Sequence, residues 1–231
     1  MFKNQKLVRD VTARINRAAN NTLKAIAVGR AQLEPQVTDR LLGAIEQELD
    51  GTFIGGIVWV AKTLTDMVKN SQEGEFGADF MGVLSLEINN FEARKGFLSQ
   101  AKLVEPSQSF RVAESKRLKG QCEKMLKFST ESFVFLYSQQ SGIRIVPAVD
   151  VVGARDCNPH ELTSKSITEF FKDHLECFIG DRAIQSATPE GLAELRAQYQ
   201  ARTGIFLGGK PKSPPKEGEG KVRKVRFKHR A

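Results

Sequence analysis

Apolar side chains recur every three or four positions in three stretches of the chain, which is the pattern of amphipathic helices. The first stretch covers residues 3–31, and Pro35 breaks the pattern after it. A second helix is predicted to run to about residue 49, with Thr38 or Asp39 as the cap of its first turn. The third helix is predicted at about 113–127.

From residue 80 the period shortens to two residues, the alternation typical of β-strands. The runs 80–88 and 96–104, separated by a polar turn, predict one pair of neighbouring strands, and the runs 132–138 and 142–149 predict another. The apolar run at 57–68 predicts a helix, with a buried strand as the alternative, because short apolar runs do not separate the two.

Two more helices are predicted at about 166–177 and 189–202, and the glycine- and proline-rich sequence from Gly208 onward predicts a flexible tail. Together these elements predict the α/β class, with a mixed β-sheet of at least four strands flanked by helices. We divide the chain into a basic amphipathic N-terminal helix at 1–32, a core at 33–152, a C-terminal helical extension at 153–208 and a flexible basic tail at 209–231.

The basic residues gather at the two ends of the chain. The formal net charge is +8; residues 1–32 contain seven Lys or Arg and one Asp, and residues 209–231 contain nine Lys or Arg and two Glu. This distribution indicates a polyanionic partner, with DNA as the first candidate and tails that serve only solubility as the alternative. The expected phosphate contacts are Arg14, Arg17, Lys221, Arg223, Lys224, Arg226, Lys228 and Arg230.

The composition excludes several other classes of protein. Hydrophobic residues make up 40% of the chain and charged residues 27%, as in folded globular proteins and unlike disordered ones. No apolar run approaches the roughly 18 residues that span a bilayer, and the N-terminal residues are charged, unlike a signal peptide. The three cysteines are an odd number at wide spacing, which does not suggest a disulfide framework. We therefore expect no membrane association and a cytoplasmic protein.

Asp79, Gln100 and Lys102 form the strongest candidate site. Asp79 precedes the first strand of the predicted pair, and Gln100 and Lys102 lie two positions apart on the second, so both side chains leave the same face. In an antiparallel hairpin Asp79 comes close to both. The carboxylate, the glutamine side-chain oxygen and the carbonyl of Ala101 are hard oxygen ligands that suit magnesium. The lysine beside them can orient a water molecule or offset charge on a phosphate.

This arrangement resembles the PD-(D/E)XK nuclease superfamily, in particular its Mrr-like restriction endonuclease branch, in which glutamine can replace the usual acid of the second motif. The resemblance covers about residues 36–150, where a helix, the Asp-bearing strand, the strand with Gln-x-Lys, a helix and two strands follow in order. It implies a restriction-endonuclease-like fold in which Asp79 is the central metal ligand, Gln100 takes the second ligand position and Lys102 is the catalytic lysine.

In many members of this superfamily the helix before the Asp-bearing strand supplies a further acid. Glu46 and Glu48 are the candidates here, with a slight preference for Glu46 and with Asp39 as a weaker third. Gln121, on the third predicted helix, is a candidate to hold a water molecule or a phosphate, and a plain polar position on the helix surface is the alternative.

The resemblance implies a metal-dependent endonuclease that hydrolyses DNA phosphodiester bonds with Mg²⁺, or with Mn²⁺ in its place. It also implies a role in a restriction or antiviral defence system, as a homodimer or as the partner subunit of a larger complex. Gln100 is uncharged where the usual pattern has an acid, which weakens metal binding. Two alternatives therefore stay open: a non-catalytic nucleic-acid-binding or scaffold subunit on a degenerate nuclease fold, and purely structural roles for the three residues.

Overall fold

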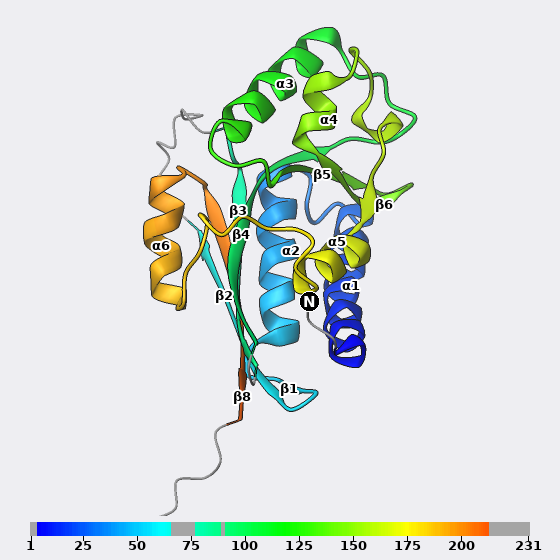
Figure 1. Ribbon diagram of the computed structural model, residues 1–231. Coiled ribbons are helices and arrows are strands. Elements are labelled where there is room, and N and C mark those ends of the chain that lie inside the picture. Colours follow the sequence, from blue (N-terminus) through cyan, green and yellow to red (C-terminus); the bar gives the residue numbers. More distant parts are fainter. Residues whose placement is uncertain (1–3, 66–76, 89–90, 213–231) are drawn as a thin grey trace, which may run out of the picture.

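The computed structural model describes residues 4–65, 77–88 and 91–212. Over these residues the chain forms an eight-stranded mixed sheet with helices on both faces, as Figure 1 shows. The strands are β1 (Phe53–Ile54), β2 (Ile57–Thr65), β3 (Phe80–Ile88), β4 (Phe91–Leu103), β5 (Ser132–Ser138), β6 (Gly142–Pro147), β7 (Lys165–Ser166) and β8 (Thr203–Pro211), and their spatial order is β1-β2-β8-β3-β4-β5-β6-β7. The helices are α1 (Gln5–Ala27), α2 (Glu34–Leu49), α3 (Val112–Leu126), α4 (Ala148–Gly153), α5 (Ile167–Leu175) and α6 (Pro189–Gln198), with a short 3₁₀ helix η1 (Pro159–Glu161).

The sheet separates two apolar cores, because successive residues of a strand point to opposite faces. Helices α1, α2 and α5 cover one face, and α3, α4 and α6 cover the other (Figure 1). In β3, Leu84 and Leu86 belong to the first core, whereas Met81 and Val83 belong to the second. The structure therefore confirms the α/β class and the mixed sheet flanked by helices.

Helices α1, α3, α5 and α6 closely match predicted helices, whereas α2 and α4 differ from the prediction. α2 begins at Glu34, several residues before the expected start, with Pro35 in its first turn, a position where the fixed φ of proline suits a helix. α4 begins at Ala148, where the apolar pattern predicts the end of a strand. Among the residues that the structure describes, no helix is both long and apolar enough to cross a membrane.

Residues 57–65 form strand β2, so the helix expected at 57–68 is wrong and its alternative, the buried strand, is observed. Ile57, Trp59 and Ala61 alternate into the core, and the segment contains several of the β-branched residues that favour strands. The last three residues of the expected helix lie outside the described part of the chain.

β8 lies inside the sheet, between β2 and β3, although it is the last strand among the described residues. All nine of its residues pair with β2, and its first seven run parallel to β3. The tail expected from Gly208 is therefore wrong over residues 208–211. A Cβ on Gly209 would lie 2.9 Å from the side chain of Leu86, so this glycine permits close packing inside the sheet. Residues 213–231 lie outside the described residues.

Because β7 and β8 extend the same sheet as β3–β6, the part of the chain assigned to a C-terminal extension shares one sheet with the expected core. The boundary drawn between residues 208 and 209 falls inside β8. The C-terminal segment thus completes the sheet, and we expect its apolar residues to contribute to stability like any other core residues.

Replacing Leu207 by alanine tests this role of β8. Leu207 is 2% exposed, and we expect Leu207→Ala to lower the free energy of unfolding by about 2–5 kcal/mol, as for other buried leucines. Lys210→Ala, at an exposed position on the same strand, should cost less than about 1 kcal/mol. Urea denaturation of both variants measures the difference, and equal small losses would contradict the central position of β8.

A buried histidine lies in an aromatic cluster between the sheet and α5. His174 is 1% exposed and contacts Phe97, Phe170 and Phe171. Its Nδ1 lies 3.1 Å from the carbonyl oxygen of Ile179, which can only accept, so Nδ1 carries the proton. Burial, and to a smaller extent the positive charge of Lys95, lower the pKa of His174 to about 3. The imidazole is therefore neutral in the folded protein at neutral pH.

We expect this histidine to destabilise the protein in mild acid. Because its pKa is lower in the folded than in the unfolded chain, its full contribution to stability is present above pH 6.5 and is lost as the pH falls toward 3. Between pH 7 and pH 5 the loss is roughly 2 kcal/mol. His174→Asn keeps an N–H donor but does not titrate, so the variant should lack this part of the pH dependence. Urea unfolding of both proteins at the two pH values checks it; equal pH dependence would contradict the assignment.

Candidate active site

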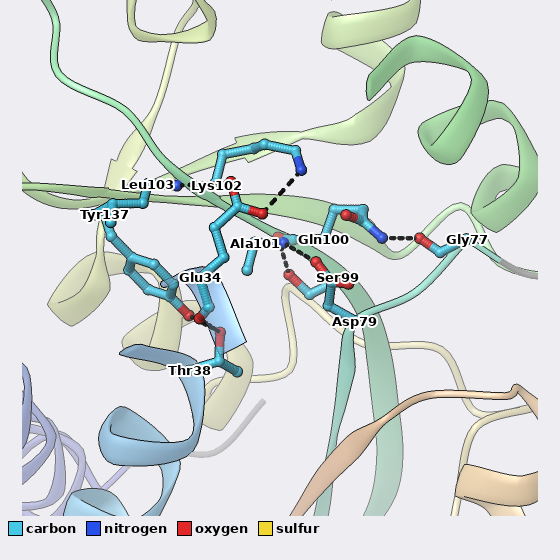
Figure 2. A network of polar contacts seen from close by, with 10 residues as sticks. All are labelled: Glu34, Thr38, Gly77, Asp79, Ser99, Gln100, Ala101, Lys102, Leu103 and Tyr137. Atoms are coloured by element: carbon cyan, nitrogen blue, oxygen red, sulfur yellow. Dashed lines mark hydrogen bonds and ion pairs between the residues drawn. The ribbon is translucent and has the colours of Figure 1, made fainter. Parts of the chain in front are cut away.

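The pairing of β3 with β4 brings Asp79 and Gln100 together. Phe80 pairs with Ser99, so Asp79, one residue earlier, lies opposite Gln100. Two hydrogen bonds hold this register: the N–H of Asp79 donates to the carbonyl of Ser99 at 2.8 Å, and the N–H of Ala101 donates to Asp79 Oδ2 at 2.9 Å. Figure 2 shows these residues around the end of the hairpin.

The side-chain amide of Gln100 is oriented by Gly77. Its Nε2 donates to the Gly77 carbonyl, and since a carbonyl only accepts, this bond fixes which end of the amide carries the oxygen (Figure 2). Gln100 is 2% exposed, and its Oε1 has no hydrogen-bond partner within the described part of the chain. A buried polar atom without a partner costs about 1–3 kcal/mol, which a ligand at this atom would recover.

Glycine is required at position 77. Its φ is +70°, and a Cβ there would lie 2.6 Å from the backbone oxygen of Gln121 on α3. Gln121 therefore lies beside the segment that orients Gln100. Its own side-chain Oε1 is also buried without a hydrogen-bond partner among the described residues.

Lys102 is held by Glu34, the first residue of α2. Lys102 Nζ lies 3.1 Å from Glu34 Oε2, and the N–H of Leu103 donates to Glu34 Oε1 at 3.3 Å (Figure 2). The lysine side chain is 15% exposed and the glutamate side chain 35%. Sequence reasoning missed Glu34. The signal that could have revealed it is the Glu-Pro pair, because proline and acidic residues are both favoured in the first turn of a helix.

Burial raises the pKa of Asp79 above its ordinary value, because its charged form loses hydration inside the protein. The hydrogen bond from Ala101 and the positive charges of Lys102 and Arg202 lower this pKa in part, whereas the negative charge of Glu34 raises it. The carboxylate of Asp79 is thus a buried acid beside a second acid, an environment that a bound cation would stabilise.

These donors fit a hard divalent cation. Asp79 and Glu34 offer carboxylate oxygens, and Gln100 offers an amide oxygen that has no other partner among the described residues. The carbonyl of Ala101 leaves the strand on the same edge as its N–H, which points to Asp79. The set contains two acids and one amide; in the described ranges no cluster of three or more His, Cys, Asp or Glu is placed to hold a metal ion.

The structure does not bring Glu46 to Asp79. Glu46 is twelve residues beyond Glu34 on α2, about 18 Å along the helix axis. Its Oε2 accepts a hydrogen bond from the N–H of Thr63 at 2.8 Å, and its Oε1 lies 3.8 Å from Lys62 Nζ. Glu46 therefore accepts a hydrogen bond from a backbone N–H on the open edge of β2, in the place of the carbonyl that a neighbouring strand would supply. On α2 it is Glu34, and not Glu46, whose carboxylate contacts Lys102.

Glu48 binds the two N-terminal arginines that the sequence assigns to DNA contacts. Arg17 Nη2 lies 2.9 Å from Glu48 Oε2, and Arg14 Nη1 donates to the Glu48 carbonyl at 2.9 Å. Both arginines thus hold the C-terminal end of α2, where positive charge is favourable. The Arg17 side chain is still 55% exposed and accessible to a phosphate. The other expected phosphate contacts lie outside the described residues: Lys221, Arg223, Lys224, Arg226, Lys228 and Arg230.

A cleft of about 180 Å³ opens beside Lys102. Glu34 and Lys102 line one part of it, and another part is lined by Phe110, just before α3, and by Glu114 and Arg117 in the first half of α3. A molecule bound at Lys102 therefore has room to extend between α2 and α3.

Comparison with protein-family models, curated proteins and solved structures finds no match to this chain.

Removing the charge of Asp79 should stabilise the metal-free protein. The side-chain oxygen of asparagine in Asp79→Asn can still accept the hydrogen bond from Ala101 but buries no charge, so we expect the free energy of unfolding to rise by about 1 kcal/mol. Asp10→Asn, at a more exposed position on α1, should change it by less than about 0.5 kcal/mol. Urea denaturation in the presence of a chelator measures both, and a loss of stability in Asp79→Asn would contradict the expected cost of the buried charge.

Proposed function

We propose that this protein is a metal-dependent nuclease that hydrolyses DNA phosphodiester bonds. The observation that carries the proposal is the convergence of Asp79, Gln100 and Lys102 from one hairpin with Glu34 from the start of α2, around an amide oxygen that has no partner among the described residues. Acidic and amide oxygens beside a lysine are the groups that metal-assisted phosphoryl hydrolysis uses. The resemblance of the same residues to the PD-(D/E)XK superfamily supports the proposal.

Asp79, Gln100 and Glu34 would hold Mg²⁺, or Mn²⁺ in its place, with the Ala101 carbonyl as a further oxygen donor. When bound, such an ion polarises the scissile phosphate and lowers the pKa of a coordinated water molecule. Lys102 is an ammonium group with donors only, so it orients the attacking water or offsets the charge that the phosphate gains in the transition state.

The charge of the chain supports a nucleic-acid substrate. The formal net charge is +8, and α3, which borders the cleft beside Lys102, carries Lys116, Arg117, Lys119 and Lys124. Phosphates on either side of the scissile bond would meet this helix. Such contacts give affinity that falls with salt and little sequence preference.

One site of this kind cuts one strand, so duplex cleavage calls for a homodimer or for a partner subunit with its own site. A place in a restriction or antiviral defence system, acting on DNA in the cytoplasm, follows from the family resemblance alone and is part of the proposal.

A second function, a nucleic-acid-binding or scaffold subunit without catalysis, is favoured by one observation. Gln100 is a neutral group at the second ligand position, and its amide nitrogen already binds Gly77. Loss of the negative charge lowers metal affinity. Both functions predict salt-sensitive DNA binding, and only the nuclease predicts cleavage that depends on a metal ion.

Cleavage of plasmid and linear DNA with Mg²⁺ or Mn²⁺ separates the two functions. We expect wild-type cleavage, a loss of about 10²- to 10³-fold in rate for Asp79→Asn and for Lys102→Ala, and DNA binding that persists in gel-shift assays. Glu46→Gln, at the far end of α2, should cleave like the wild type. Gln100→Glu restores a charge and should bind Mn²⁺ more tightly.

Cleavage that survives both Asp79→Asn and Lys102→Ala would overturn the site. A wild-type protein that binds DNA but neither binds Mn²⁺ nor cleaves would favour the scaffold function.

A further inference from the structure

The start of β8 lies directly beside the candidate active site. The N–H of Thr203 donates to the backbone carbonyl of Asp79 at 3.2 Å, and its fully buried side chain donates to Asp39 Oδ1 at 3.0 Å. The residue just before it, Arg202, acts electrostatically on Asp79. β8 therefore meets both the hairpin that carries Asp79 and the first turns of α2.

Arg202 binds the start of α2 at two points. Its Nη1 lies 2.8 Å from Asp39 Oδ2, and its Nη2 donates to the carbonyl of Pro35 at 3.2 Å. Pro35 directly follows Glu34, and the Arg202 side chain is only 22% exposed. The guanidinium therefore spans one turn of the helix whose first residue is Glu34.

Both local and distant contacts hold the start of α2: the side-chain oxygen of Gln36 accepts from the Leu33 N–H at 3.3 Å, and other parts of the fold add further bonds. Its N-cap residue, Leu33, makes no side-chain capping hydrogen bond. Thr38 is tied to the Tyr137 hydroxyl at 3.0 Å, and Arg202 and Thr203 add the bonds to Pro35 and Asp39. A cation at a helix N-terminus opposes the helix dipole, so helix stability alone does not favour an arginine here.

We propose that Arg202 is a positioning residue for the metal site: by holding the first turn of α2, it places Glu34 against Lys102 and beside Asp79. This inference rests on the proposed function. In this role the Arg202–Asp39 pair supports catalysis indirectly, and neither residue contacts the substrate. The competing role is direct contact between Arg202 and a DNA phosphate.

The test measures Mn²⁺ binding by calorimetry without DNA, and the Mg²⁺ dependence of cleavage at saturating DNA. Arg202→Gln and Asp39→Asn remove the two halves of the same pair, and we expect each to weaken metal affinity by a similar factor of about 10 to 100. Arg40→Gln is the control: it removes one positive charge, as Arg202→Gln does, but at the exposed position that follows Asp39 on α2. It should bind Mn²⁺ like the wild type. Thermal unfolding checks that each variant is folded, and Arg202→Lys, which keeps the charge but cannot span both contacts, should be intermediate.

A double-mutant cycle with Glu34→Gln shows whether Arg202 acts through Glu34. If Arg202 acts only through Glu34, the Arg202→Gln/Glu34→Gln double variant should bind Mn²⁺ as tightly as Glu34→Gln alone, because the Arg202 substitution has no further effect once Glu34 is replaced. Affinity for DNA without metal should be unchanged in Arg202→Gln and in Asp39→Asn.

Three outcomes would overturn the inference or its basis. If Arg202→Gln binds DNA more weakly with a salt slope reduced by about one, while Asp39→Asn binds DNA more tightly, Arg202 contacts phosphate directly. If wild type, Arg202→Gln and Asp39→Asn bind Mn²⁺ equally and cleave equally, the positioning role fails and the nuclease stands. If the wild type neither binds Mn²⁺ nor cleaves, the proposed function itself fails.

Discussion

The candidate site depends on the register between β3 and β4. Asp79 meets Gln100 because Phe80 pairs with Ser99, and the bond from the Ala101 N–H to the Asp79 carboxylate fixes that register at the very end of the hairpin. A shift by one residue would turn the polar side chains of β4 to the other face of the sheet, into the aliphatic and aromatic core under α1 and α2. The same pairing that builds the core therefore determines which side chains meet at the site.

Charged side chains of both signs come together at the candidate site, and the positive charges partly compensate the negative ones. Burial raises the pKa of Asp79, and the cations of Lys102 and Arg202 offset part of that cost. The neutral amide of Gln100 adds no further repulsion between acids, and its orientation is held by the carbonyl of Gly77. A third carboxylate at this position would bind a cation more tightly but would make the metal-free fold less stable. A glutamine rather than an acid at position 100 therefore favours the stability of the metal-free fold over affinity for a cation.

Local patterns in the sequence predict most of the elements and the hairpin pair, because periodicity and turn residues act over short distances. They do not predict the position of β8. Its glycines are typical of a flexible tail, and only the fold shows that Leu86 and the neighbouring strands pack against them. Local patterns also select the wrong end of α2. Glu34 and Glu46 are both acids on one helix, and only the tertiary packing determines that the helix start meets the hairpin while Glu46 binds the edge of β2. The sequence predicts that α2 contributes an acidic residue, but it does not predict which end of α2 lies beside the hairpin.

The central position of β8 also determines when the site can form. Its partners β2 and β3 precede it by well over one hundred residues, and such distant pairings are intrinsically slow because the entropy of closing a long loop is lost before the contacts compensate for it. Until Thr203 reaches Asp79 and Arg202 reaches Asp39, the contacts with which these two residues hold the start of α2 and the hairpin are missing. Glu34, Asp79 and Gln100 all precede β8 in the sequence, yet their arrangement is complete only when β8 has paired with its neighbours. The candidate site is therefore a property of the whole sheet, and an incomplete chain that contained all three donors would lack the contacts that align them.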